Sequence, residues 1–107
     1  MKVVCDNAGN ALCFSRSPIP FLRSRDREEW PRLHQYLTHV GVYAYRRVVL
    51  STLPSLPPSP LEKAESLEQL RWLQAGLRIK VAITRHTTAG IDTPADLEAA
   101  RLMLRKP

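Results

Sequence analysis

The amino-acid sequence predicts an α/β domain that opens with an antiparallel β-hairpin. Three observations indicate this class: two apolar stretches joined by turn residues at the start, a well-capped helix in the middle, and segments with the period-2 alternation of strands between the helical segments. Helices that alternate with strands are typical of α/β folds. At 107 residues, the chain has the length of a single small domain.

The first fifteen residues form the predicted hairpin. Residues 2–5 (KVVC) and 11–15 (ALCFS) are rich in β-branched, aromatic and other apolar side chains, and residues 6–10 between them are turn-forming. A loop follows, because Pro18 and Pro20 each fix the backbone and remove a hydrogen-bond donor. We expect it to continue through the charged run 23–29 as a solvated surface segment.

A second strand is predicted from Thr38 to Tyr45, where Val40, Val42 and Ala44 alternate with the residues between them. Residues 46–53 then predict a short helix, which ends at the proline-rich stretch 54–58.

The helix predicted over residues 60–75 is the best defined. Ser59 can cap its start, Pro60 suits its first position, and Glu62 can complete a capping box. Gly76 supplies a left-handed stop. An apolar stripe that should face the core is formed by Ala64, Leu67, Leu70 and Leu73.

The last third of the chain predicts a strand, a polar loop and a final helix. Residues 77–84 (LRIKVAIT) alternate as a half-buried strand does, and residues 85–92 form the loop. Thr93 is the expected N-cap of the helix, with Pro94 at its first position and Asp96 near the positive end of its dipole.

Composition narrows the classes of protein. A hydrophobic content of 44% with mixed charges indicates a folded chain. No apolar run approaches the roughly 20 residues that span a bilayer, so membrane insertion is not expected. Cys5 and Cys13 form no CxxC pair and no secretory leader is apparent, which favours a reducing cytoplasm and two small buried side chains. The net charge of +6 suits an anionic partner, and nucleic acid is one candidate.

Four segments of the chain are unusually specific. They are KVV (2–4) with ALCFSRSPIPF (11–21), HVGVYAYR (39–46), PPSPLE (57–62) with ESLEQLR (65–71), and GIDTPADLE (90–98). In their order and spacing across nearly the whole chain, they resemble one enzyme family, the CMP-Kdo synthetases. These cytidylyltransferases activate Kdo, the eight-carbon acidic sugar of bacterial lipopolysaccharide. Zinc-protease, nucleophile-elbow and phosphate-loop motifs are not found in the sequence.

The resemblance implies a fold and a place within it. The chain would be the C-terminal portion of a nucleotide-diphospho-sugar transferase-like, Rossmann-like fold, and residues 1–107 would form one partial domain for sugar binding and dimerisation. The family's phosphate loop and its QGDEP segment have no counterpart here. We therefore expect CTP to have no site on this chain and the chain alone to be inactive. The chain also departs from the family at Cys13, where an aromatic residue is usual, and at Ala89, where glycine is more usual.

The resemblance also implies roles for particular residues. Arg16 would bind the acid group of the substrate, with Arg23 as a less secure second contributor, because a guanidinium can hold a carboxylate through two bonds. His39 and Tyr43, four apart on the predicted strand, would lie on one face and bind the sugar. A structural histidine and a solvated arginine are the alternatives at His39 and Arg23.

Further polar residues complete the expected site. Glu68 and Gln69, on the side of the helix away from the leucines, would reach sugar hydroxyls. Glu65, one turn before Gln69, could join them or be a surface charge. Asp92 would be a ligand of Mg²⁺, which prefers carboxylate oxygen, and its alternative is an ordinary carboxylate at a helix start.

The expected partners are Kdo, CTP where the first half of the protein is supplied, and a second copy of the chain in a homodimer. Two alternative hypotheses stay open. One is a non-catalytic sugar-binding or interaction module, and the other is a basic RNA-binding domain, supported by charge alone. If the chain lacks a first half, the leucine face of the 60–75 helix and the strand from Thr38 to Tyr45 should be exposed.

Overall fold

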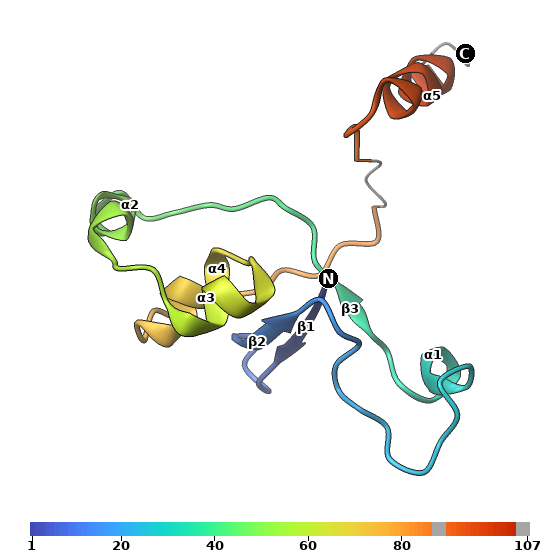
Figure 1. The fold of residues 1–107 in the computed structure, drawn as a ribbon, viewed down its shortest axis with the longest axis horizontal. Coiled ribbons are helices and arrows are strands. Elements are labelled where there is room, and N and C mark those ends of the chain that lie inside the picture. Colours follow the sequence, from blue (N-terminus) through green and yellow to red (C-terminus); the bar gives the residue numbers. More distant parts are fainter. Residues whose placement is uncertain (87–89, 105–107) are drawn as a thin grey trace.

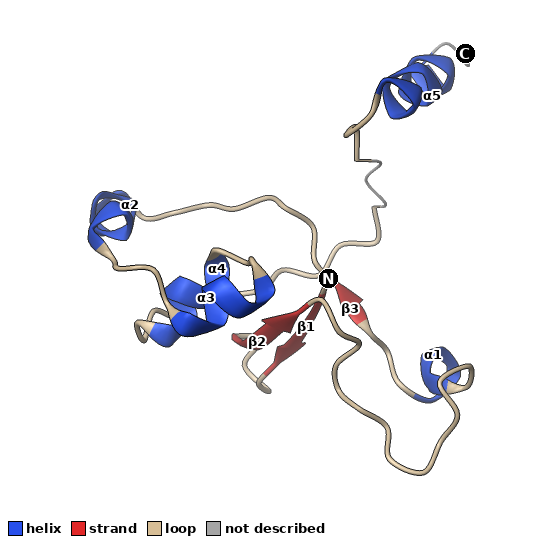
Figure 2. Ribbon diagram, viewed as in Figure 1, coloured by secondary structure: helices blue, strands red, loops and turns tan. Residues whose placement is uncertain are grey.

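A small antiparallel sheet lies at the centre of the computed structural model, which describes residues 1–86 and 90–104. Its strands are β1 (Lys2–Cys5), β2 (Ala11–Ser15) and β3 (Leu37–Thr38), in the order β2-β1-β3. In the hairpin, Val3 is opposite Phe14 and Val4 is opposite Cys13. The α/β class and the opening hairpin are therefore confirmed (Figures 1 and 2).

The hairpin turn is closed by one side chain. The Asp6 carboxylate accepts hydrogen bonds from the backbone N–H of Asn10 at 2.8 Å and from its side-chain amide at 2.9 Å. Gly9 has a φ of 77°, in the left-handed region that glycine enters at little cost. The turn predicted over residues 6–10 thus forms by side-chain capping and a glycine.

The helices are short. They are α1 (Trp30–Leu33), α2 (Arg47–Thr52), α3 (Pro60–Glu65), α4 (Gln69–Gln74) and α5 (Pro94–Leu104), with a 3-10 turn, η1 (Leu53–Ser55), after α2. α2 confirms the helix predicted over 46–53. α5 confirms the final helix, and its cap forms as expected because the Thr93 hydroxyl accepts from the backbone N–H of Asp96 at 3.2 Å.

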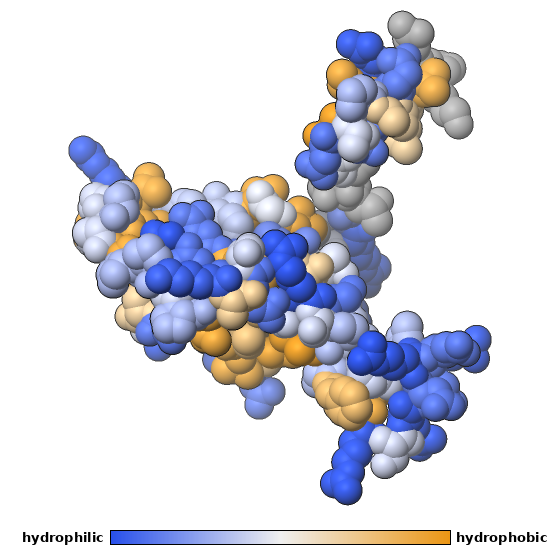
Figure 3. All heavy atoms as spheres, in the orientation of Figure 1, coloured by the Kyte–Doolittle hydropathy of each residue, from blue (hydrophilic) through white to orange (hydrophobic). Residues whose placement is uncertain are grey.

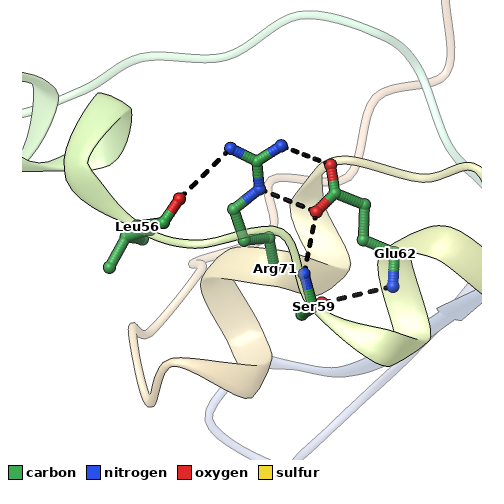
Figure 4. A network of polar contacts seen from close by, with 4 residues as sticks. All are labelled: Leu56, Ser59, Glu62 and Arg71. Carbon is green, nitrogen blue, oxygen red and sulfur yellow. Dashed lines mark hydrogen bonds and ion pairs between the residues drawn. The ribbon is translucent and has the colours of Figure 1, made fainter.

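The single helix predicted over 60–75 is wrong in its continuity. The capping box at its start is present, since Ser59 and Glu62 exchange backbone-to-side-chain hydrogen bonds of 3.2 Å. However, α3 ends at Ser66, whose left-handed backbone (φ 51°) turns the chain before α4. The two helices are then tied by Arg71 of α4, which donates to the Glu62 carboxylate of α3 (Figure 4).

The break also changes which leucines are buried. Leu67 and Leu70 follow the break and pack on the hairpin, with 5% and 2% of their surfaces exposed. The expectation that the leucine face would be uncovered is therefore wrong. Val42, in the segment after β3, is 81% exposed, as expected of that segment.

Both longer strands predicted later in the chain are also wrong. β3 ends at Thr38, so residues 39–45 are not a strand. Residues 77–84 contribute only a bridge between Lys80 and Asn10, with the Val81 N–H bonded to the Gly9 carbonyl at 2.9 Å. Alternation predicts an extended, half-buried segment, but a strand also needs a neighbouring backbone with which to pair.

The core lies between the sheet and α4. It consists of Val3, Ala11, Phe14, Leu67 and Leu70. The radius of gyration, 16.8 Å, exceeds the ~13 Å typical of a compact domain of this length. Figures 1 and 3 show the reason, since α1 and α5 stand away from the central body.

Candidate functional site

His39 and Tyr43 form the centre of the candidate site. His39 Nε2 and the Tyr43 hydroxyl oxygen lie 2.6 Å apart, within hydrogen-bonding distance. His39 follows directly after β3, and its ring packs edge-on against Phe14 of β2, with ring centres 5.6 Å apart. The structure thus brings the predicted pair together, although no strand sets their spacing.

Burial keeps both members of this pair uncharged. It lowers the pKa of His39, to which the nearby N-terminal ammonium adds. It raises the pKa of Tyr43 to about 12, with further contributions from Tyr45 and the Glu68 charge. At neutral pH the pair is therefore a neutral imidazole beside a phenol. Together these groups can donate hydrogen bonds to a hydroxyl-rich ligand and accept hydrogen bonds from it.

The start of α4 borders the pair. Glu68 precedes the first residue of α4 and is exposed, and its charge acts on both Tyr43 and Tyr45. Gln69 is only 6% exposed, and its side-chain amide donates to Met1 Sδ at 3.0 Å. The expectation that Gln69 points away from the buried face is wrong, because the start of α4 packs on the N-terminus of the chain.

Trp72 connects the His39–Tyr43 pair with α4 and was not among the expected site residues. It is 7% exposed, and Tyr43 and Tyr45 both pack against its indole at about right angles, with ring centres 5.4 and 5.6 Å away. Trp72 stands one helical turn after Glu68, so the two share a face of α4. That spacing was a signal in the sequence, but it did not reveal which residues the indole contacts.

Arg16 lies at the end of β2 and is held by the end of α3. Its Nε donates to the Glu65 carbonyl at 2.6 Å, and its Nη2 donates to the Ser66 carbonyl at 3.0 Å. The Glu65 carboxylate accepts from the Ser15 hydroxyl at 2.6 Å and from the Arg16 backbone N–H at 2.8 Å. Glu65 therefore holds Arg16 in place and is not merely a surface charge.

Arg23 and Asp92 are not brought to this cluster. Arg23 is exposed in the loop between β2 and α1, which runs away from α4 in Figure 1. Asp92 is exposed just before α5, which stands apart from the sheet and α4. Its backbone N–H donates to the Asp96 carboxylate at 3.3 Å. The candidate site gathered by the structure is therefore His39, Tyr43, Glu68 and Gln69, with Arg16 at the neighbouring strand end.

Comparison with known proteins decides the family. A family model described as "Cytidylyltransferase" matches residues 1–79. The chain belongs to the cytidylyltransferase family. The match covers the first three of the four segments that carry the resemblance.

Two bacterial relatives of this cytidylyltransferase chain carry the same enzyme name. It is 54% identical over 104 residues to a 3-deoxy-manno-octulosonate cytidylyltransferase of Porphyromonas gingivalis, and 55% identical over 104 residues to one of Bacteroides thetaiotaomicron. A solved structure of CMP:2-keto-3-deoxy-manno-octonic acid synthetase complexed with CTP matches with 48% identity and a TM-score of 0.85. This likeness confirms the expected fold class.

These matches cover the two partners unequally. They include 97% of this cytidylyltransferase chain but only 41% and 42% of the two bacterial relatives, and 96% against 40% for the solved structure. The chain therefore spans about two-fifths of the length of the relatives it matches. This confirms the expectation that it corresponds to only part of a CMP-Kdo synthetase.

The structure also bears on metal binding and on membrane insertion. Within residues 1–86 and 90–104 of this cytidylyltransferase chain, no three His, Cys, Asp or Glu side chains are grouped so as to hold a metal ion. The single carboxylate of Asp92 still suits Mg²⁺, which usually binds through one or two carboxylates together with water and substrate phosphates. In the part of the chain that the structure describes, no helix is long and apolar enough to cross a membrane.

Proposed function

We propose that this chain is the sugar-binding portion of a CMP-Kdo synthetase, which joins Kdo to the cytidylyl group of CTP and releases pyrophosphate. The observation that carries the proposal is the His39–Tyr43 pair at 2.6 Å beside Glu68, within a fold shared with the solved CMP:2-keto-3-deoxy-manno-octonic acid synthetase. Donor and acceptor groups gathered at one edge of α4 suit a ligand with many hydroxyls.

In this proposal each residue has a distinct task. His39 and Tyr43 orient sugar hydroxyls, Glu68 accepts from them, and Gln69 supports the start of α4 from its buried position. A guanidinium carries five N–H groups. Arg16 uses one on Nε and one on Nη2 to bond the Glu65 and Ser66 carbonyls, so it keeps further donors. Those donors are available for the acid group of Kdo, with Arg23 as a second cation.

We propose Asp92 as the residue that would hold Mg²⁺. The ion, when bound, would draw together phosphate and carboxylate oxygens and offset their negative charge. The exposure of Asp92 supports this role, since most ligands of the ion would then come from water and substrate. We propose CTP as the co-substrate, bound outside the residues assigned to the sugar.

We further propose that the chain works in the cytoplasm as a homodimer. Cys5 and Cys13 are both free thiols, which supports a reducing compartment. Exposed apolar side chains on α2 and α5 support self-association, among them Val48 at 77% and Leu104 at 86%. Sedimentation velocity tests the dimer, and a monomer at all concentrations would contradict it.

Calorimetric titration with Kdo tests the sugar site directly. We expect the chain to bind Kdo and His39→Ala to weaken that binding. His34→Ala is the matched control, since it removes a histidine near α1 that is not part of the candidate site. The alternative, a binding module without catalysis, predicts the same titration. It differs in predicting that no CMP-Kdo forms when the chain is joined to the missing first half and given CTP, Kdo and Mg²⁺. Salt-sensitive oligonucleotide binding with no response to Kdo would instead favour the RNA-binding alternative.

A further inference from the structure

The segment 39–45 carries two residues of the candidate site but is not held by strand pairing. Its first residue, His39, donates its backbone N–H to the Met1 carbonyl at 3.2 Å, and Val42 bonds to Val40 within the segment. Beyond these bonds, aromatic packing holds the segment beside α4. Tyr43 and Tyr45 stack on each other, with ring centres 6.0 Å apart, and both rings meet Trp72.

We infer that Trp72 is a positioning residue for sugar binding, which fixes Tyr43 at hydrogen-bonding distance from His39 and beside Glu68. The inference rests on the proposed function and deepens it. Trp72 does not contact the sugar itself in this proposal, since the residue is 7% exposed and its indole packs against the two tyrosines.

The geometry explains why this position matters. His39 is fixed independently, through Phe14 and through the Met1 carbonyl. Tyr43 is fixed on the other side by the indole, at an interplanar angle of 90° that is favourable for an aromatic pair. If the indole is lost, His39 should stay in place while Tyr43 moves, so the 2.6 Å contact between them should open.

A Leu side chain at position 72 would keep the apolar character but not the aromatic ring. The pair of edge-to-face contacts would be lost, and Tyr45 would lose its support at the same time. Phe at this position keeps a ring against both tyrosines. Trp72→Leu and Trp72→Phe therefore separate the positioning role from simple burial.

The experiment compares these two variants with the unmodified chain, using Kdo titration by calorimetry and the nuclear Overhauser contact between the His39 and Tyr43 rings. Trp30→Phe is the matched control, because Trp30 packs against Phe21 and Tyr36 near α1. We expect Trp72→Leu to lose the ring contact and to bind Kdo about tenfold more weakly, the effect of one or two aromatic pairs. Trp72→Phe and the control should keep both.

Each contrary result is decisive. If Trp72→Leu keeps the ring contact, or loses it and binds Kdo as before, the inference is overturned. If the unmodified chain binds no Kdo, the proposed function fails and the sugar-positioning role falls with it, while the ring contact still shows what holds Tyr43. Should Trp72→Leu lose its cooperative melt, Trp72→Met, which keeps more side-chain volume, takes its place in both measurements.

Discussion

Arg16 and Glu65 are joined through both backbone and side chain, although 49 residues separate them in the sequence. The Arg16 backbone N–H donates to the Glu65 carboxylate, and the Arg16 guanidinium donates to the Glu65 carbonyl. The end of β2 is thereby tied to the end of α3. This contact fixes the arginine that we propose for the acid group of the substrate.

Glu65→Gln should lower both the melting temperature and the affinity for Kdo. The new amide has one acceptor oxygen where the carboxylate has two, so either Ser15 or the Arg16 N–H would face an amide donor instead of an acceptor. We expect the melting midpoint to fall by a few degrees, measured by circular dichroism. Glu98→Gln on α5, whose partner Arg101 is 59% exposed, is the control and should melt as the unmodified chain does.

Acid should destabilise the fold through two carboxylates. The hydrogen bond from Arg71 lowers the pKa of Glu62, and the hydrogen bond from Ser15 lowers the pKa of Glu65, each from a usual value of 4.5. Since each folded-state pKa lies below the unfolded value, the stabilisation is complete above about pH 4.5 and is lost as the pH falls through the folded pKa. Urea melts between pH 7 and pH 3 measure this, and a midpoint that is constant below pH 4.5 would contradict it.

Ser66→Gly should stabilise the fold. Ser66 has a φ of 51°, a left-handed conformation that costs a residue with a Cβ about 1 kcal/mol relative to glycine. Ala64→Gly, two residues earlier within α3, is the matched substitution and should destabilise by about 0.5–1 kcal/mol. Opposite changes in the urea midpoint are expected. If both variants lose stability, the left-handed break between α3 and α4 is not as described.

The break between α3 and α4 separates what the sequence predicts from what only the folded chain decides. The capping box at Ser59 and the N-cap at Thr93 are local, and both were predictable from residue type and spacing. Ser66 carries no such signal. Its turn is held by a distant residue, Arg16 after β2, which donates to the Glu65 and Ser66 carbonyls. Local rules predict where helices start, whereas contacts between distant segments decide where this one ends.

The same distinction holds in the candidate site. The spacing of His39 and Tyr43 predicted a common face, and the structure joins them, but through aromatic packing with Trp72 and not through a strand. The alternation of residues 39–45 could not show this, because a strand needs a neighbour that the sequence pattern does not identify. The buried position of Gln69 likewise depends on Met1, which is distant in the sequence.

Leu70→Ala should bring the chain close to unfolding at room temperature. Leu70 is 2% exposed and lies in the core between α4 and the hairpin, where such a truncation costs about 2–5 kcal/mol. Small domains have little more than this to lose. Leu102→Ala on α5 is the control, because Leu102 is 58% exposed and its loss should change the free energy of unfolding by no more than about 0.5 kcal/mol. Equal effects of the two changes would contradict the described core.

The central claim, that this chain supplies the sugar-binding portion of a CMP-Kdo synthetase, is tested most directly in a chimera. The segment of the Porphyromonas gingivalis relative that matches this chain over 104 residues is replaced by the chain itself, and formation of CMP-Kdo from CTP, Kdo and Mg²⁺ is measured. We predict that the chimera forms CMP-Kdo and that His39→Ala in the inserted segment raises the KM for Kdo more than the KM for CTP. A folded chimera that binds CTP but neither binds Kdo nor forms CMP-Kdo would contradict the claim.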